Sequence, residues 1–394
     1  MKKTKVLFAV HQLNYGGVQK SAITALNAID YSGNDVTLYV RKNRLQLLPE
    51  VNRNVSRIIV NEDPTRYYRI PYLAWLSVCQ YMARLVKNRR WDDALQKKIV
   101  TYLTEAQMNY EKEHYFPDTE EYDIAVSYIS GYTAEFVARC VNAKRKIMFY
   151  HASTDENHDL HEEIMPCFDR IVGVNENVRN ILRELYPSVS NRMTYIDNYV
   201  DAEEIRRKSL LFTPDRPEDR AVLCSCGRFA PVKGFDLAVR AAKLLKEKGI
   251  RFLWYFVGDG PERVNLEQMI SEYGLEDCIR ITGMQDNPYP YLGCCDVYVQ
   301  PSYEEAYGLT IAEAQILGKP VVTTATVGGK FLIENEATGL ISDIGADDLA
   351  DQIIRMLSEE DLRQRIADSL QKIDYTADFL RYQSDWKRLL EEKI

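Results

Sequence analysis

The stretch from Gln300 to Thr324, which reads QPSYEEAYGLTIAEAQILGKPVVTT, constrains the fold more than any other part of the chain. The run from Asp296 to Gln300 that leads into it reads as a strand, and the run after the loop has helical composition. Gly318 and Pro320 end that helix, and two valines then begin a new strand. The stretch therefore predicts a βαβ unit of a parallel sheet, with a loop-to-helix junction from Tyr307 to Thr310.

Two carboxylates flank this junction at positions 305 and 313. The N-terminus of a helix carries unpaired N–H groups and the positive end of the helix dipole, so it attracts phosphate. Gly308 lets the backbone approach a ligand closely. Glu313 would lie about one turn inside the helix, where a carboxylate can hold a diol such as a ribose. The alternative is an ordinary βαβ turn with surface glutamates.

The pattern Pro-Ser-x-x-Glu-x-Tyr-Gly-Leu-Thr-x-x-Glu-Ala is similar to the Glu-x7-Glu signature of the family 4 retaining glycosyltransferases, which have the GT-B fold. Gly308 and Glu313 set the register, so Glu305 and not Glu304 matches the first glutamate. The chain departs from the family at Ala306, where glycine is usual.

A second motif of this family follows the predicted strand AVLCSC that begins at Ala221. The segment from Gly227 to Gly234, GRFAPVKG, closely matches the family's Gly-Arg-x4-Lys-Gly loop, and a helix is expected from Asp236. Arg228 and Lys233 lie five residues apart on this strand-to-helix turn, where they can clamp a diphosphate from two sides. The alternative is a pair of surface charges in a βα loop.

The resemblance also implies roles for single residues. Glu305 would hold hydroxyls of the donor sugar, Glu313 the ribose, and the end of the strand Ile279–Met284 the nucleotide base. The implied catalytic residues are Glu305, Arg228, Lys233 and His151. The implied donor-binding residues are Gly16, Gly17, Gly227, Arg228, Lys233, Gly283, Met284, Glu305, Tyr307, Gly308, Leu309, Thr310 and Glu313.

The amino-terminal half begins with an apolar strand from Lys5 to His11, a turn with Gly16-Gly17 and a helix from Ser21 to Ile29. Strand, glycine-bearing turn and helix are typical of a Rossmann-like domain, although a tight turn alone would leave the same pattern. In the family this turn faces the cleft and touches donor phosphate and acceptor.

Short apolar runs at 124–128, 146–150 and 170–174 predict further parallel strands. His151 follows the second run at its carboxyl end, where ligands of α/β proteins bind. The family often has a histidine near this place that contacts the donor sugar, and a purely structural histidine is the alternative. His158 and His161 have acidic neighbours, so a metal site must be considered, but the spacing of the two histidines does not favour one.

Residues 64–112 predict two helices instead of the β-α alternation, and residues 41–112 hold 14 Lys or Arg against 7 Asp or Glu, a net charge of +7. A basic surface interleaved with aromatic residues could rest on anionic lipid or face an anionic acceptor. Two core-packing helices with solvated outer faces would show the same pattern.

We therefore expect two Rossmann-like domains facing each other over a cleft, at residues 1–200 and 201–375. A helix at residues 376–394 is expected to cross back to the first domain, as in GT-B enzymes. The segment from Tyr195 to Asp201 resembles the interdomain crossing of the family, and Phe212–Asp219 reads as a linker. Gly328-Gly329 and residues 338–341 would complete the second sheet.

The composition limits the partners. A length of 394 residues suits two domains, and the net charge of −8 argues against nucleic acid as the main partner. No apolar run approaches the length of a membrane span. The eight cysteines are scattered, which fits reduced thiols in the cytoplasm. A place at the inner face of the cell membrane stays open.

The resemblance implies a retaining transfer of a hexose or N-acetylhexosamine from a nucleotide sugar, with uridine the commonest nucleotide. Glycan, glycolipid and cell-wall polymer acceptors are plausible, and neither a cofactor nor a metal ion is expected. Two alternatives are a non-catalytic nucleotide-sugar-binding partner of a transferase complex and another GT-B enzyme, such as an epimerase.

Overall fold

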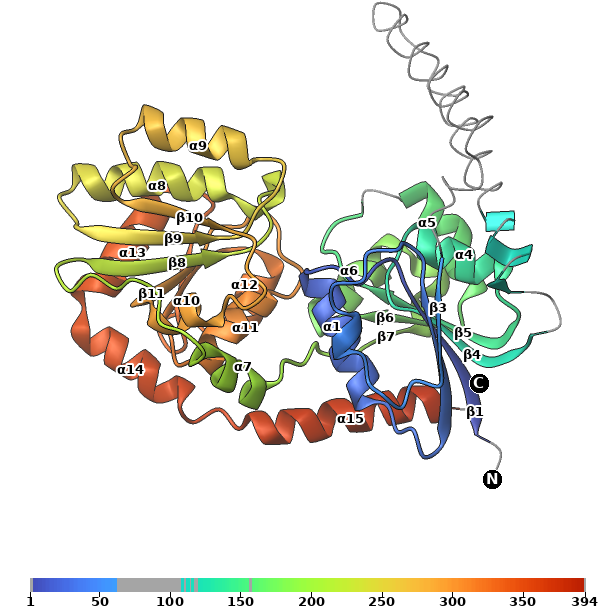
Figure 1. The fold of residues 1–394 in the computed structure, drawn as a ribbon. Helices are drawn as coiled ribbons and strands as arrows, with labels where there is room; N and C mark the ends of the chain where they lie inside the picture. Colours follow the sequence, from blue (N-terminus) through green and yellow to red (C-terminus); the bar gives the residue numbers. More distant parts are fainter. Residues whose placement is uncertain are drawn as a thin grey trace, which may run out of the picture.

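The computed structural model describes residues 3–61, 108–109, 111–113, 115–116, 120–155 and 158–392. In these ranges the chain forms two parallel sheets, which lie in separate halves of the molecule (Figure 1). Each sheet has an apolar cluster on both faces, so helices cover it on both sides. The expected pair of Rossmann-like domains is thus confirmed.

The amino-terminal sheet has the strand order β3-β2-β1-β4-β5-β6-β7. Successive residues of β1 alternate between the two faces, because Leu7 and Ala9 join one apolar cluster while Val6 and Phe8 join the other. The strands are β1 Thr4–Val10, β2 Asn34–Val40, β3 Arg57–Val60, β4 Tyr122–Ser127, β5 Ala143–Tyr150, β6 Arg170–Gly173 and β7 Met193–Tyr195. The helices are α1 Gly17–Ala28, α4 Tyr132–Cys140, α5 His158–Ile164 and α6 Glu176–Leu185.

The carboxyl-terminal sheet has the order β10-β9-β8-β11-β12-β13. Its strands are β8 Ala221–Cys226, β9 Phe252–Val257, β10 Ile279–Gly283, β11 Val297–Gln300, β12 Val321–Thr324 and β13 Leu340–Ser342. The helices are α7 Ala202–Ser209, α8 Phe235–Glu247, α9 Arg263–Glu272, α10 Tyr289–Cys294, α11 Leu309–Ile316, α12 Val327–Leu332, α13 Ala346–Ser358 and α14 Glu360–Leu370. The βαβ unit predicted from residues 300–324 is β11, α11 and β12.

One expectation for this sheet is wrong. Gly328 and Gly329 do not complete it but lie in α12, whose first turn is capped by Thr326. The physical reason is close packing, since a Cβ on Gly328 would lie 2.4 Å from the carbonyl oxygen of Tyr307. Gly328 N instead donates a 2.7 Å hydrogen bond to the carbonyl of Glu305. The glycine pair therefore lets α12 support the loop that precedes α11.

The chain crosses between the domains twice. Residues 196–201 form the first crossing, and α7 then packs against α10 and α11 of the second domain. The linker-like segment after α7 does not bridge the domains, because Phe212 packs on Tyr291 and Arg216 pairs with Asp296. Both contacts keep the segment on the carboxyl-terminal domain.

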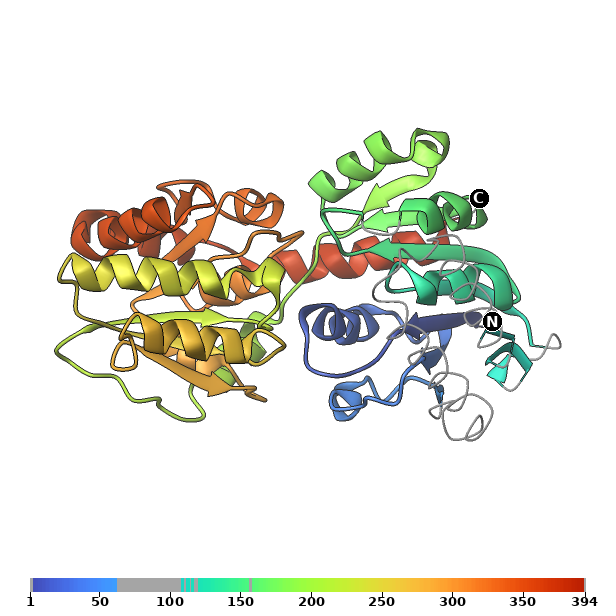
Figure 2. The same cartoon turned by 90° about the horizontal axis from the view of Figure 1, so that it is seen from above.

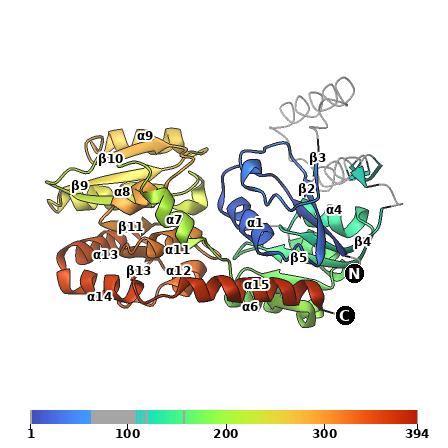
Figure 3. The ribbon, with the colours of Figure 1, turned by 60° about the horizontal axis from the view of Figure 1, so that its bottom comes forward.

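The second crossing is the helix α15, Tyr375–Glu391, which runs back along the amino-terminal domain (Figures 2 and 3). Trp386 is fully buried there, and its ring stacks on Phe149 of β5 at 5.0 Å. Arg170 forms an ion pair of 2.6 Å with Glu392 just after the helix. The expected return of the terminal helix to the first domain is confirmed.

Most of the basic region at residues 64–112 lies outside the described residues. From its carboxyl-terminal end, buried Glu111 pairs with Arg41 at 2.9 Å. In the described ranges, no helix has both the length and the apolar character that crossing a membrane requires.

Candidate active site

The loops that follow β8 and β11 form the centre of the candidate site. These strands are neighbours at the point where the strand order of the second sheet reverses, which is where open α/β sheets bind ligands. The two loops pack tightly, because Gly234 has a φ of +64° and a Cβ there would lie 1.9 Å from the carbonyl oxygen of Pro301. Only glycine allows this approach.

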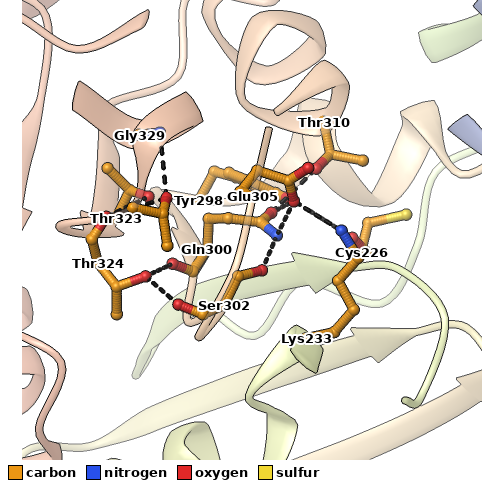
Figure 4. Close-up of polar contacts among 11 residues, drawn as sticks. Cys226, Lys233, Tyr298, Gln300, Ser302, Glu305, Thr310, Thr323, Thr324 and Gly329 are labelled. Carbon is orange, nitrogen blue, oxygen red and sulfur yellow. Dashed lines mark hydrogen bonds and ion pairs between the residues drawn. The ribbon is translucent and has the colours of Figure 1, made fainter. Parts of the chain in front are cut away.

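Lys233 and Glu305 meet across the two loops. Lys233 Nζ lies 2.7 Å from Glu305 Oε2, and both side chains are partly buried (Figure 4). The structure therefore brings together two residues that the sequence predicted on different motifs. Arg228 lies on the same loop as Lys233, after Gly227, and its side chain is exposed.

Gln300, at the end of β11, organises this centre. Its buried amide donates to Ser302 Oγ at 2.8 Å and reaches Glu305 Oε2 at 3.5 Å. Its oxygen accepts hydrogen bonds from Tyr298 at 2.6 Å and Thr310 at 2.9 Å (Figure 4). The sequence analysis missed this role, although an amide at the end of the strand VYVQ was a visible signal.

Helix α11 begins directly beside this network. Gly308 precedes it with a φ of +96°, a conformation that favours glycine, and Leu309 is its first residue. Thr310 is held by Gln300, so the first turn is fixed relative to Glu305. The unpaired N–H groups of the helix start thus follow the loop that carries Glu305, close to its ion pair with Lys233, where they favour an anion.

The loop between β11 and α11 also contacts the amino-terminal domain. Asn175 donates from Nδ2 to the carbonyl of Ala306 at 2.7 Å, and Tyr307 donates to the carbonyl of Asn198 at 2.6 Å. The side chain of Ala306 joins the apolar cluster of the other domain. The alanine that departs from the family pattern is therefore accommodated inside the interface.

The glycine turn after β1 lies opposite α11. A Cβ on Gly17, the first residue of α1, would lie 3.3 Å from Leu309 of α11. Gly16 precedes α1 as its N-cap residue. Two helix starts, one from each domain, therefore face the same part of the interface.

Glu313 contacts two residues that the sequence analysis did not select. Its carboxylate is 2% exposed, and Oε1 lies 3.4 Å from Lys20 Nζ of the other domain and 3.1 Å from the Tyr289 hydroxyl. A cavity of about 260 Å³ lies between the domains here and is lined by these three residues and by Leu309. The one sequence signal for the contact between Lys20 and Glu313 was the position of Lys20 on α1, three residues after Gly17.

Gly283 is the last residue of β10, the edge strand of the second sheet, and Met284 follows it. Gly283 has a φ of +75°, and its carbonyl accepts a 3.0 Å hydrogen bond from Gly258 N. Met284 is 52% exposed. β10 is separated from β8 by β9, so these residues lie at the edge of the site.

His151 follows β5 and packs against the ring of Tyr128 at 4.9 Å. Burial lowers the pKa of His151 to about 4, so the imidazole is neutral at physiological pH. Its Nε2 has no hydrogen-bond partner among the residues that the structure describes. The neutral ring carries no positive charge, and this nitrogen is buried.

His161 is engaged in the fold. Its Nδ1 lies 2.7 Å from Asp155 Oδ1, and its Nε2 accepts a hydrogen bond from Gly131 N at 3.2 Å. His158 bonds to the hydroxyl of Tyr186 at 2.9 Å. In the described part of the chain, no group of three or more His, Cys, Asp and Glu side chains could hold a metal ion.

Known proteins resemble both the sequence and the fold of this chain. The model of the family described as glycosyl transferases group 1 matches residues 206–372. This stretch of the carboxyl-terminal domain is therefore similar to the group 1 glycosyl transferases. The matched stretch contains the loops of Lys233 and Glu305 and the helix that carries Glu313.

Curated relatives match less than half of the chain. The lipopolysaccharide core biosynthesis glycosyltransferase LpsE of Rhizobium meliloti is 36% identical over 155 residues, which are 39% of this chain and 44% of LpsE. The alpha-D-kanosaminyltransferase of Streptomyces kanamyceticus is 30% identical over 184 residues, 45% of this chain and 48% of that enzyme. The chain thus spans less than half the length of these relatives.

Solved structures match over the whole chain. TarM has a TM-score of 0.71 and 14% identity, covering 100% of this chain and 99% of that one. HepE of Anabaena, solved in complex with UDP-glucose, has a TM-score of 0.69 and 16% identity, covering 98% and 99%. These similarities confirm the GT-B arrangement of the two domains.

Proposed function

We propose that the protein is a retaining glycosyltransferase that moves a hexose or N-acetylhexosamine from a UDP-sugar to a glycan, glycolipid or cell-wall polymer. The observation that carries the proposal is the Lys233–Glu305 pair of 2.7 Å beside the start of α11. A cation, a carboxylate and a helix N-terminus converge there, inside the stretch that is similar to the group 1 glycosyl transferases.

The main barrier to glycosyl transfer is the charge that develops on the leaving diphosphate. Lys233 and Arg228, with the N–H groups at the start of α11, would stabilise that charge. Glu305 would exchange its contact with Lys233 for hydroxyls of the donor sugar. The free nitrogen of neutral His151 would bind a further sugar hydroxyl.

Support for the donor comes from HepE, whose structure was solved with UDP-glucose. Support for the acceptor class comes from LpsE and its role in lipopolysaccharide core biosynthesis. A lipid-linked acceptor would place the protein at the inner face of the cell membrane.

The direct test is a screen for nucleotide release from a panel of nucleotide sugars, with and without lipid and glycan acceptors. We expect UDP release that depends on one donor sugar and increases with acceptor. Binding of nucleotide sugar with no release under any condition would instead indicate a non-catalytic binding partner.

The proposal includes metal-independent catalysis, because Lys233 and Arg228 supply the positive charge that a divalent cation would otherwise supply. Turnover should therefore be unchanged in EDTA. Loss of turnover in EDTA with recovery in magnesium or manganese would contradict this part of the proposal.

A further inference from the structure

Lys20 of the amino-terminal domain reaches the buried carboxylate of Glu313 in the other domain. Its Nζ lies 3.4 Å from Glu313 Oε1 and 3.3 Å from the hydroxyl of Tyr289, and that hydroxyl lies 3.1 Å from the same oxygen. Lys20 also lies over the Tyr289 ring, 4.8 Å from its centroid. Three side chains from two domains thus form one closed set of contacts.

The two oxygens of Glu313 have different surroundings. Oε1 takes both contacts, whereas Oε2 is buried and has no hydrogen-bond partner among the described residues. A buried carboxylate oxygen without a partner is costly, because it has lost its water. Glu313 lines the interdomain cavity, so a ligand there can supply the missing donor.

Lys20 is held as a cation at this position. Burial lowers the pKa of Lys20, but the charge of Glu313 and the contact with Tyr289 outweigh it, so the pKa lies above its ordinary value. The side chain of Lys20 is 30% exposed, whereas that of Glu313 is 2% exposed. The carboxylate therefore keeps a fixed, charged partner that only the opposite domain provides.

We propose that Lys20 and Tyr289 are positioning residues that hold Glu313 Oε1 and thereby leave Oε2 as the acceptor for the ribose diol of the donor. The proposal rests on the proposed function, in which Glu313 binds the ribose. Because Lys20 belongs to the amino-terminal domain, the ribose acceptor is oriented only when the two domains are closed. Recognition of the nucleotide and closure of the cleft are then one coupled event.

The alternative is that the same contacts of Lys20 hinder nucleotide binding. Lys20 could occupy the ribose site and leave when the nucleotide enters. The two arrangements differ in the effect of removing the ammonium group, since positioning predicts weaker nucleotide binding and competition predicts tighter binding.

The test compares UDP with 2′,3′-dideoxy-UDP, which lacks the diol, by calorimetry on the full chain. The variants are Lys20→Met and Tyr289→Phe, with Lys20→Arg as the conservative replacement. Lys387→Met, at an exposed lysine of α15, is the matched control. Circular dichroism establishes that each variant is folded.

We expect the parent protein and Lys387→Met to prefer UDP over the dideoxy analogue by about tenfold, a typical effect of one hydrogen bond to a charged group. Lys20→Met and Tyr289→Phe should lose most of this preference, while their affinity for the dideoxy analogue stays within about twofold of the parent. Lys20→Arg should recover part of the preference. In turnover, the donor KM should rise more than kcat falls.

An unchanged preference in folded Lys20→Met, or tighter UDP binding by it, would overturn the positioning role while leaving the glycosyltransferase proposal intact. A parent protein that binds no nucleoside diphosphate and releases none from any donor would overturn the proposed function and this inference with it.

Discussion

Asn175 donates a hydrogen bond of 2.7 Å from its side-chain amide to the backbone carbonyl of Ala306 in the opposite domain. The same side chain accepts a 2.8 Å hydrogen bond from Val178 N and so caps helix α6. Asn175 is fully buried. One residue therefore caps the start of a helix of the first domain and holds the loop that carries Glu305 in the second.

Asn175→Ala should lower both stability and donor affinity. It removes the cap, worth about 1 kcal/mol, and leaves the Ala306 carbonyl buried without a donor, at a cost of about 1–3 kcal/mol. Asn175→Ser keeps a capping oxygen but is too short to reach Ala306. Urea unfolding should place Asn175→Ser between the parent and Asn175→Ala, and both variants should raise the donor KM. Parent-like unfolding of Asn175→Ala would contradict this account.

Lys233→Ala and Arg228→Ala should each reduce turnover strongly, because each removes positive charge from the developing diphosphate. An effect of about 2–4 kcal/mol on the barrier is typical of such groups, which corresponds to a loss of about 30-fold to 1,000-fold in kcat. Lys243→Ala, at an exposed lysine of α8 that pairs with Glu247, serves as the control. Steady-state kinetics on variants with parent-like melting temperatures would decide. Near-normal turnover in either variant would remove that cation from the mechanism.

The new glycosidic bond should keep the anomeric configuration of the donor. An inverting reaction needs a base that deprotonates the acceptor in line behind the anomeric carbon. Here both motif glutamates have proposed binding roles, and the cations Lys233 and Arg228 are assigned to the diphosphate, which suits departure and attack on one face. Glu305→Gln should slow the reaction without changing the product anomer. The anomeric coupling in the NMR spectrum of the product tests this, and a β-linked product from an α-linked donor would contradict it.

Acidification should destabilise the folded protein through His151. Burial lowers the pKa of this ring to about 4, whereas an unfolded histidine has its ordinary value of about 6.5. Between these values the unfolded chain binds a proton that the folded chain does not, so the free energy of unfolding falls as pH decreases from 6.5 to 4. Above pH 6.5 the ring is neutral in both the folded and the unfolded chain, so His151 no longer makes the free energy of unfolding depend on pH.

His151→Gln should therefore flatten the pH dependence of the melting temperature in this window. His11 offers a parallel case, because burial and the neighbouring cations Lys42, Arg41 and Arg44 lower its pKa to about 4 as well. The double variant should be flatter than either single one. An equally steep loss of stability in His151→Gln would show that other groups cause it.

The local βαβ unit around Glu305 was predictable because its signals are close in sequence. A strand, a glycine at 308 that requires a positive φ, and the stop at Gly318 and Pro320 all lie within residues 297–324. The pairing of Lys233 with Glu305 was not predictable in detail, since it depends on Gly234 meeting Pro301. The glycine pair of α12 was misassigned for a related reason, because a helix of six residues is too short to show a helical period.

By itself, the sequence predicted two α/β domains, a helix start of the kind that attracts phosphate and a candidate set of cations and carboxylates. Strand and helix periodicity, glycine conformation and helix capping are local properties, so they can be read from neighbouring residues. Only the tertiary structure decided that Lys20 meets Glu313 and that Asn175 meets Ala306. Those partners are 293 and 131 residues apart, and what joins them is the packing of one domain against the other, which leaves no local pattern in the chain.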